Sequence, residues 1–383
     1  MQRLATGLQN GVARFTLVWS IASALSSITT AGWSQTLTWL GTLGGYRSWA
    51  KGVSADGSVV VGWARNAAGW DRAFRWTAAG GMQDIGTLGG NRSEAFGVSA
   101  DGSVVIGEAQ SAEKSNRLGS FLAFPRICAF RWTVASGVQD LGRLPGGSDS
   151  WARGVSSDGS VVVGGAEIAS RDVRAFRWTA SSGMVDIGSL GGDYSVANAV
   201  SADGSVVVGG AKNAAKRYHA FRWTATGGIQ DLGTLGGTES EALGVSADGS
   251  VVVGRAKNAA GKNRAFRWTA AGGMQDLGTL GGTESWAYGV SADGSVVVGE
   301  SKNVARKSRA FRWTAAGGME DLNTTYASLL TNGSVLEVAS AISPDGRYIV
   351  GKGWNAATKR PEAFLLDTRP RSVQGASDLA DRK

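Results

Sequence analysis

Residues 201–235 read SADGSVVVGGAKNAAKRYHAFRWTATGGIQDLGTL, and this stretch holds one copy of the repeat that decides the fold. Its opening tetrapeptide, Ser-x-Asp-Gly, occurs seven times, beginning at residues 54, 99, 156, 201, 246, 291 and 343. Successive copies lie 45, 57, 45, 45, 45 and 52 residues apart. Because a four-stranded propeller blade takes about 40–45 residues, this period predicts a β-propeller.

Each unit contains four short strands, which we call a to d, with turn residues between them. In the first copy, strand a covers residues 49–53, strand b 58–62, strand c 73–77 and strand d 82–86. The a–b turn is Asp-Gly and the c–d turn contains Gly-Gly, which favour tight turns. Strand b is apolar on both faces, as is typical of a strand buried on both sides. Small residues recur two apart in every strand a, so we expect strand a to line the crowded central channel.

The two ends of the repeat region predict that the ring is closed. The seventh unit ends after its strand c, near residue 366, and an extra strand d at residues 39–43 precedes the first unit. We expect this N-terminal strand to complete the last blade, which leaves no free sheet edge. The sequence therefore predicts an all-β fold over residues 36–367, a seven-bladed β-propeller with four antiparallel strands in each blade.

Units one to six share an Arg in strand c and an Asp nine residues later in strand d. If Thr77 pairs with Met82 across the turn, the Arg of the first unit lies directly opposite the Asp, where opposite charges are favourable. In the last blade the two positions hold Leu365 and Trp39, so both charges are missing together. We expect structural ion pairs of Arg75 with Asp84, Arg131 with Asp140, Arg177 with Asp186, Arg222 with Asp231, Arg267 with Asp276 and Arg312 with Asp321.

Composition and the chain ends narrow the classes of protein. One His and one Cys among 383 residues exclude multi-histidine and cysteine-based metal centres, so we expect no metal and no cofactor. Residues 1–35 combine two Arg with a short apolar stretch, which favours a secretory signal peptide; an uncleaved membrane anchor is the alternative. No later apolar run predicts a transmembrane bundle, and we expect the polar residues 368–383 to be disordered. We expect a monomer that is extracellular, periplasmic or on the cell surface.

Residues 218–224, Tyr-His-Ala-Phe-Arg-Trp-Thr, together with Gly227-Gly228 and the strand that begins at Asp231, resemble the HAF repeat of bacterial extracellular repeat proteins. The resemblance covers about residues 36–366, because the motif recurs in register. Only His219 supplies the His of the triplet, and the other copies carry Arg72, Cys128, Arg174, Arg264, Arg309 and Glu362. The resemblance implies export or surface display and implies no particular activity or ligand.

The loops divide between the two faces of the predicted ring. The a–b and c–d turns share one face and barely vary, whereas the b–c and d–a loops share the other face. All length variation lies on that second face, with 12 extra residues (57 − 45) within 108–127 and 7 (52 − 45) within 323–336. Since variable loops on a rigid scaffold are common binding sites, we expect ligand binding there.

Positive charge gathers in the b–c loops of blades 4 to 6. The formal net charge of the chain is +8, and in these loops only Glu300 opposes the cations nearby in sequence. Such a patch predicts an anionic polysaccharide or another extracellular polyanion as partner. A protein partner, and a solvated basic rim that only keeps the chain soluble, are the alternatives. The candidate binding residues are Lys212, Lys216, Arg217, Tyr218, Lys257, Lys262, Arg264, Arg306, Lys307 and Arg309.

Two functions remain open on these observations. The first is an exported binding or interaction module, and the second is a polysaccharide lyase or hydrolase with unlike acid and base groups at the channel mouth. The residues between the two small positions of strand a would line this mouth: Lys51, Phe96, Arg153, Asn198, Leu243, Tyr288 and Ser340. Because we expect no carboxylate beside them, the binding module is favoured and no catalytic residue is assigned.

Overall fold

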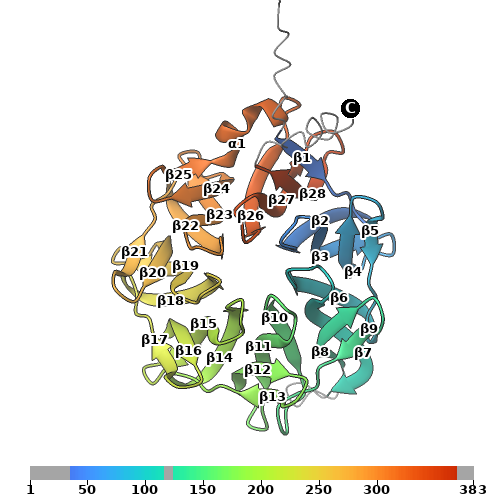
Figure 1. The fold of residues 1–383 in the computed structure, drawn as a ribbon, viewed down its shortest axis with the longest axis vertical. Helices are drawn as coiled ribbons and strands as arrows, with labels where there is room; N and C mark the ends of the chain where they lie inside the picture. The colour runs from blue at the N-terminus through green and yellow to red at the C-terminus, as the bar shows by residue number, and fades with distance from the viewer. Residues whose placement is uncertain (1–34, 116–123, 369–383) are drawn as a thin grey trace, which may run out of the picture. The chain divides into compact units, whose positions relative to one another are not determined.

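Seven antiparallel sheets of four strands form a ring in the computed structural model, which describes residues 35–115 and 124–368 (Figure 1). The described residues all fall within one unit, Ser34–Pro370. The seven-bladed β-propeller predicted from the repeat is confirmed. Residues 1–34 of the predicted signal peptide and residues 369–383 of the predicted tail lie outside the described residues.

The first three blades follow one another along the chain. Blade 1 consists of β2 (Gly44–Val53), β3 (Val59–Asn66), β4 (Asp71–Thr77) and β5 (Gly81–Asp84). Blade 2 consists of β6 (Gly89–Val98), β7 (Val105–Ser115), β8 (Phe124–Thr133) and β9 (Gly137–Asp140). Blade 3 consists of β10 (Ser150–Val155), β11 (Val161–Glu167), β12 (Val173–Thr179) and β13 (Gly183–Asp186).

The next three blades repeat this order. Blade 4 consists of β14 (Gly191–Val200), β15 (Val206–Asn213), β16 (Tyr218–Thr224) and β17 (Gly228–Asp231). Blade 5 consists of β18 (Gly236–Val245), β19 (Val251–Asn258), β20 (Asn263–Thr269) and β21 (Gly273–Asp276). Blade 6 consists of β22 (Gly281–Val290), β23 (Val296–Asn303), β24 (Ser308–Thr314) and β25 (Gly318–Asp321).

Blade 7 is built from both ends of the repeat region, as predicted. It consists of β26 (Val335–Ile342), β27 (Tyr348–Asn355), β28 (Arg360–Asp367) and the N-terminal β1 (Thr36–Trp39). β1 pairs antiparallel with β28, and Trp39 lies opposite Phe364. The two rings make an edge contact, with centroids 6.2 Å apart and an interplanar angle of 74°. This contact helps to hold the seam of the ring closed.

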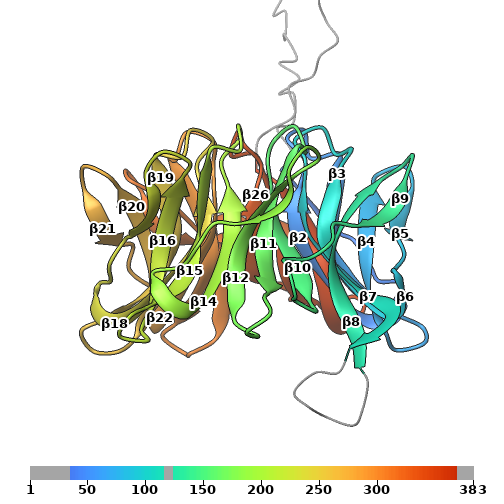
Figure 2. The same cartoon turned by 90° about the horizontal axis from the view of Figure 1, so that it is seen from below.

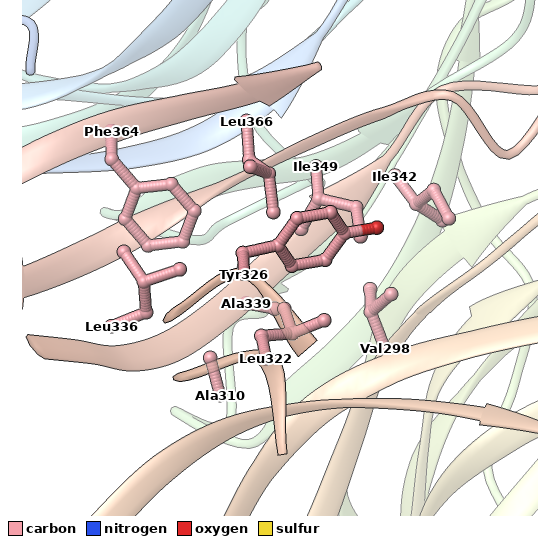
Figure 3. Close-up of a cluster of buried hydrophobic side chains, with 10 residues drawn as sticks. All are labelled: Val298, Ala310, Leu322, Tyr326, Leu336, Ala339, Ile342, Ile349, Phe364 and Leu366. Atoms are coloured by element: carbon pink, nitrogen blue, oxygen red, sulfur yellow. The ribbon is translucent and has the colours of Figure 1, made fainter. Parts of the chain in front are cut away.

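The extra residues before blade 7 form part of the same seam. They fold into α1 (Leu322–Thr325) and η2 (Ala327–Leu329), which join blade 6 to blade 7. Tyr326 follows α1, is 2% exposed, and lies in the centre of an apolar cluster that includes Leu336 and Phe364 (Figure 3). This insertion on the loop face therefore fills the core between two blades.

Strand a is the innermost strand of every blade, as the small residues predict (Figure 1). Figure 2 shows the blades from the side, with their connections gathered at two opposite faces. Between the blades, the Phe of each strand c is fully buried: Phe74, Phe130, Phe176, Phe221, Phe266, Phe311 and Phe364.

Buried serine hydroxyls connect neighbouring blades. Ser240 in β18 donates to the carbonyl of Gly233 and accepts the N–H of Ala220 from the preceding blade at 2.8 Å. One hydroxyl therefore satisfies two backbone groups from different segments, of which the Ala220 N–H is buried, and this fixes the spacing of the blades. The equivalent serines are Ser48, Ser93, Ser150, Ser195 and Ser285.

The predicted Arg–Asp pairs are wrong, because the c–d hairpin closes one residue earlier than expected. Gly81 adopts a left-handed φ of +63° and pairs with Thr77, so Asp84 lies opposite Phe74. The same shift separates Arg75 from Asp84, Arg131 from Asp140, Arg177 from Asp186, Arg222 from Asp231, Arg267 from Asp276 and Arg312 from Asp321.

Each Asp instead contacts the residue at the first position of the HAF triplet. Arg72 Nε lies 2.9 Å from Asp84, and His219 Nδ1 lies 2.8 Å from Asp231. In blade 7 the triplet begins with Glu362, which would repel an Asp, and Trp39 stands at the Asp position. Some strand-c arginines have other partners, such as Arg222, which donates to the carbonyl of Gly249 in the next blade.

Candidate binding site

A β-bulge in every strand a places one side chain of each blade in the central channel. In blade 1, Ala50 pairs with Gly62 and Gly52 pairs with Val61, so Lys51 between them has no partner across the sheet. A bulge re-aims its extra residue, and Lys51 lines the channel. The seven bulged residues are Lys51, Phe96, Arg153, Asn198, Leu243, Tyr288 and Ser340, and all of them line one cavity, as predicted.

We call two residues that lie opposite each other on strands a and b a rung. Two neighbouring rungs differ in whether their residues are the same in all blades. The rung of Ala50 and Gly62 is Ala with Gly in all seven blades. Glycine is required there, because a Cβ on Gly62 would collide with the carbonyl oxygen of Trp49. The next rung toward the loop face is different in every blade. Its pairs are Trp49–Trp63, Glu94–Glu108, Trp151–Gly165, Val196–Gly210, Glu241–Arg255, Trp286–Glu300 and Val338–Lys352.

The other end of the channel keeps the symmetry of the repeat. One Val or Ile and one small residue or proline from each blade line a cavity of about 190 Å³, as Val53 and Ala55 do in blade 1. Backbone hydrogen bonds run between blades around this end, beginning with the N–H of Ala55 and the carbonyl of Ala100. The blades therefore repeat one apolar arrangement at the a–b turn face and diverge only at the loop face.

The mouth on the loop face is a cavity of about 460 Å³, within the range of about 300–1,000 Å³ for small-molecule sites. Its aromatic lining comes from five different blades: Trp49, Phe96, Trp151, Tyr194, Tyr218 and Tyr288. Its polar lining consists of Lys51, Arg153, Asn198, Glu241 and Ser340. Flat apolar rings with a few converging polar groups are typical of a ligand site.

Lys51 places a partly buried amine in the lining of this mouth cavity. Its Nζ lies 3.4 Å from the centroid of the Trp49 ring, and the Nζ of Lys352 lies 4.3 Å from the same ring. Burial lowers the pKa of Lys51 to about 7; the Glu94 charge opposes this shift, and the charges of Arg153 and Lys352 add to it. Near neutral pH the amine is therefore divided between its charged and neutral forms.

Carboxylates of the neighbouring rung show that the expectation of no acidic group beside the bulged residues is wrong: Glu241 lines the mouth cavity, and Glu94 interacts electrostatically with Lys51. Glu94 and Glu108 are direct partners across β6 and β7, where like charges are unfavourable. The pKa of Glu94 is raised to about 7, mainly by burial and also by the Glu108 charge, although the charges of Lys51 and Arg153 lower it. Glu108 also forms an ion pair with Arg153 at 3.4 Å. The bulged positions hold no carboxylate, but the neighbouring rung does.

A third carboxylate, Glu241, is fixed by groups from two blades, 4 and 5. Arg255 Nη2 lies 2.8 Å away, the Asn198 amide donates to it at 3.3 Å, and the Tyr218 hydroxyl donates at 3.4 Å. The Tyr218 ring packs against that of Tyr194, with centroids 5.9 Å apart. Burial raises the pKa of Tyr218, and the Glu241 charge raises it further, so this hydroxyl is a neutral donor.

The ten residues predicted to bind a polyanion lie on the loop face, but the structure divides them. Four form ion pairs with carboxylates: Lys212 with Asp193, Lys257 with Glu239, Arg264 with Asp276 and Arg309 with Asp321. Tyr218 lies in the mouth cavity instead. The expectation that only Glu300 opposes these cations is therefore wrong, because strands a and d supply carboxylates from elsewhere in the sequence. The other five of the ten are exposed cations that form no ion pair with a described residue: Lys216, Arg217, Lys262, Arg306 and Lys307.

Other reactive side chains have structural roles. His219 is held by Asp231, and the Cys128 thiol is buried, which raises its pKa to about 11. Across residues 35–115 and 124–368, no three His, Cys, Asp or Glu side chains are grouped so that they could hold a metal ion. In the same part of the chain, no helix has the length and apolar character needed to span a bilayer.

The residues of the unlike rung were not predicted, although the sequence carries a signal for them. They stand just before the first small residue of strand a and just after the Gly of strand b, as Glu94 and Glu108 do. The pair of residues at these two positions is different in every copy, while the Ala and Gly beside them stay the same. A variable position inside an otherwise constant strand marks a place where the fold alone does not dictate the residue.

The fold and this cavity define a seven-bladed β-propeller with an asymmetric, aromatic-lined channel mouth. No protein-family model matches the chain, and no curated protein does. Among solved structures, TolB from Acinetobacter baumannii is similar with a TM-score of 0.46 and 12% identity, over 78% of this chain and 76% of that one. A puromycin hydrolase mutant complexed with PGG is similar with a TM-score of 0.48 and 14% identity, over 87% of this chain and 55% of that one. The assignment of the fold rests on this chain's own strand pairing.

Proposed function

We propose that this propeller is an exported or surface-associated binding module of the HAF-repeat type, and that it binds an acidic polysaccharide in its mouth cavity. One observation carries the proposal: the blades lose their sevenfold repetition at this mouth and keep it at the other end of the channel. Seven identical blades would satisfy the fold. Unlike side chains that converge on one cavity are therefore best explained by a ligand that has unlike parts.

The chemistry of the lining supports a sugar with negative charge. Rings such as Trp49 and Trp151 offer flat apolar surfaces on which the C–H faces of sugar rings can stack. Lys51 and Arg153 place cationic groups among these rings, and Tyr218 adds a neutral hydroxyl donor. Together they would orient a carboxylated sugar by stacking and by charge-assisted hydrogen bonds.

The five unpaired loop cations support the same class of ligand. Lys216, Arg217, Lys262, Arg306 and Lys307 lie on the loop face that carries the mouth cavity. Their field would raise the local concentration of a polyanion and speed its association. Because they are exposed, salt should screen this contribution strongly, while contacts inside the cavity should be less affected.

A binding panel tests the proposal. The full chain is titrated with polygalacturonate, alginate, hyaluronate and neutral dextran, at low and at physiological salt. We expect binding to at least one acidic polymer, and a loss of at least tenfold in affinity for Trp151→Ala. Trp70→Ala is the matched control, because Trp70 is an exposed tryptophan outside the mouth cavity. Equal binding of dextran, or unchanged binding by Trp151→Ala, would refute the proposal.

Cleavage of the bound polysaccharide is a second candidate function, favoured by the cluster of Lys51, Glu94 and Glu108. A carboxyl that keeps its proton near neutral pH can act as a general acid, and a partly neutral amine as a general base. In a β-elimination on a uronate, Lys51 would take the proton from the carbon beside the carboxylate. The bond to the leaving sugar oxygen would break as a C=C bond forms, and Glu94 would protonate that oxygen.

Product analysis separates the two functions. Each acidic polymer that binds is incubated with the full chain, and new reducing ends and unsaturated uronate ends are measured. Elimination gives both kinds of end, whereas hydrolysis gives reducing ends alone. Glu94→Gln should abolish turnover while binding remains. If no polymer gains ends, the chain is a binding module without this activity.

A further inference from the structure

A second cavity opens on the loop face at the junction of blades 2 and 3. It has a volume of about 580 Å³ and is lined by Glu108 and Ile127 of blade 2 and by residues within 146–153 and 167–171 of blade 3. We call it the outer cavity.

Strand a beside the outer cavity is shorter than in most other blades. Strand a has ten residues in blades 1, 2, 4, 5 and 6, but β10 of blade 3 has only six, Ser150–Val155. In the longer strands the outer half pairs with the end of strand b, as Gly191 does with Asn213 in blade 4. The residues before β10 make no such ladder pair but still lie against the end of β11, since the Glu167 N–H donates to the Asp149 carbonyl at 2.9 Å, and the outer cavity lies beside Glu167 and Ile168.

The mouth cavity and the outer cavity are adjacent, because Trp151 and Arg153 line both. The Trp151 ring lies against Gly165, where an added Cβ would come within 2.8 Å of the ring. Gly165 therefore lets the ring lie flat on the sheet between the two cavities. A ligand that crosses from one cavity to the other would pass over this ring.

The charges of the outer cavity differ from those of the mouth. Three carboxylates line it, Glu108, Asp149 and Glu167, against the two guanidinium groups of Arg153 and Arg171. A sugar unit that carries its own negative charge would face this carboxylate excess. An uncharged unit rich in hydroxyl groups would instead find both acceptors and donors.

We infer that the ligand is an extended glycan chain that runs from the mouth cavity over Trp151 into the outer cavity, with an acidic unit in the mouth and an uncharged unit in the outer cavity. This inference rests on the proposed function, and it names the substrate class more closely: an acidic polysaccharide in which charged and neutral sugars alternate.

Oligosaccharide length and one cavity-filling variant test the inference. Hyaluronate oligomers of two, four, six and eight units serve as the alternating probe, and galacturonate oligomers serve as the probe with a charge on every unit. Ala169→Trp fills the outer cavity, since Ala169 lines it and is exposed. Ala214→Trp is the matched control, because Ala214 holds the equivalent loop position in blade 4.

We expect the hyaluronate hexamer to bind the full chain at least tenfold more tightly than the dimer does. Ala169→Trp should lower the affinity for the hexamer to that for the dimer and leave the affinity for the dimer unchanged. Ala214→Trp should change neither affinity. Equal affinity at all lengths, or no effect of Ala169→Trp, would show a compact ligand and overturn the inference while the proposed function stands. Tighter binding of galacturonate oligomers would overturn the alternation. If no oligomer and no polymer of the panel binds, the proposed function fails as well.

Discussion

The substitution Lys51→Met should make the protein more stable near neutral pH and remove part of its pH dependence. Burial holds the pKa of Lys51 at about 7, against 10.5 for a free lysine. Below pH 7 the charged amine therefore costs the folded state about 5 kcal/mol, since a tenfold change in proton affinity corresponds to about 1.4 kcal/mol. The variant also loses the contact of the amine with Trp49, which is worth about 2 kcal/mol when desolvated. The net gain is then about 3 kcal/mol.

The direction of the pH dependence follows from proton binding. Between pH 7 and 10.5 the unfolded chain binds more protons at Lys51 than the folded chain does, so stability rises with pH in this window. The pKa of Glu94 is raised from 4.5 to about 7, so stability falls with pH between these values. The wild-type chain should have a minimum near pH 7 from this pair. Lys51→Met should lose the rise above pH 7 and keep the fall below it.

Thermal unfolding from pH 5 to 10 measures both effects. At about 2 °C for each kcal/mol, the variant should melt about 6 °C above the wild type at pH 6, and the difference should vanish near pH 10. Lys262→Met is the control, because Lys262 is exposed and forms no ion pair with a described residue. A variant that melts below the wild type throughout pH 5 to 7 would refute the reasoning, because the buried amine would then stabilise the fold.

Three further predictions concern the scaffold. Ser240→Ala should lower the free energy of unfolding, measured with denaturant, by about 1–3 kcal/mol, because the Ala220 N–H and the Gly233 carbonyl each lose a partner. Ser250→Ala, at an exposed serine, should lower it less. Trp39→Ala should cost about 2–3 kcal/mol and increase hydrogen exchange in β1 and β28, and unchanged exchange there would argue against its role in the seam. Hydrogen bonds from Ser246 and Ser250 hold the pKa of Asp248 at about 2. The stability that Asp248 contributes is therefore complete above pH 3.8 and is lost as pH falls toward 2. The melting temperature of Asp248→Asn should depend less on pH in that window.

The bulges show which residues of the site could be predicted from the strand patterns in the sequence. Small residues two apart predict which strand lines the channel, and they identify Lys51 and its six equivalents as lining residues. The bulge itself leaves no mark in the alternation of apolar and polar residues. Its consequence, that Glu94 and Glu108 form the adjacent rung at the mouth, depends on pairing between two strands and was missed.

The c–d hairpin shows how a single residue of register changes an electrostatic prediction. Arg75 and Asp84 have the right spacing for a pair if Met82 lies opposite Thr77. Gly81 takes that place because its left-handed conformation lets it join the ladder. Because of the one-residue shift, Asp84 contacts Arg72. The Asp of strand d therefore pairs with the first residue of the HAF triplet and not with the later Arg of strand c.

The period, the turns and the displaced strand d are local features, and they were enough to predict seven blades, the innermost strand and the closure of the ring. A blade repeats the same short-range geometry wherever its sequence recurs, so counting copies counts blades. Beyond the seven bulged residues, the lining of the mouth was decided by the tertiary structure, because its cavity gathers side chains from segments as distant as Trp49 and Ser340, 291 residues apart. Which charges meet, which are buried and how their pKa values shift depend on distances that only the closed ring sets.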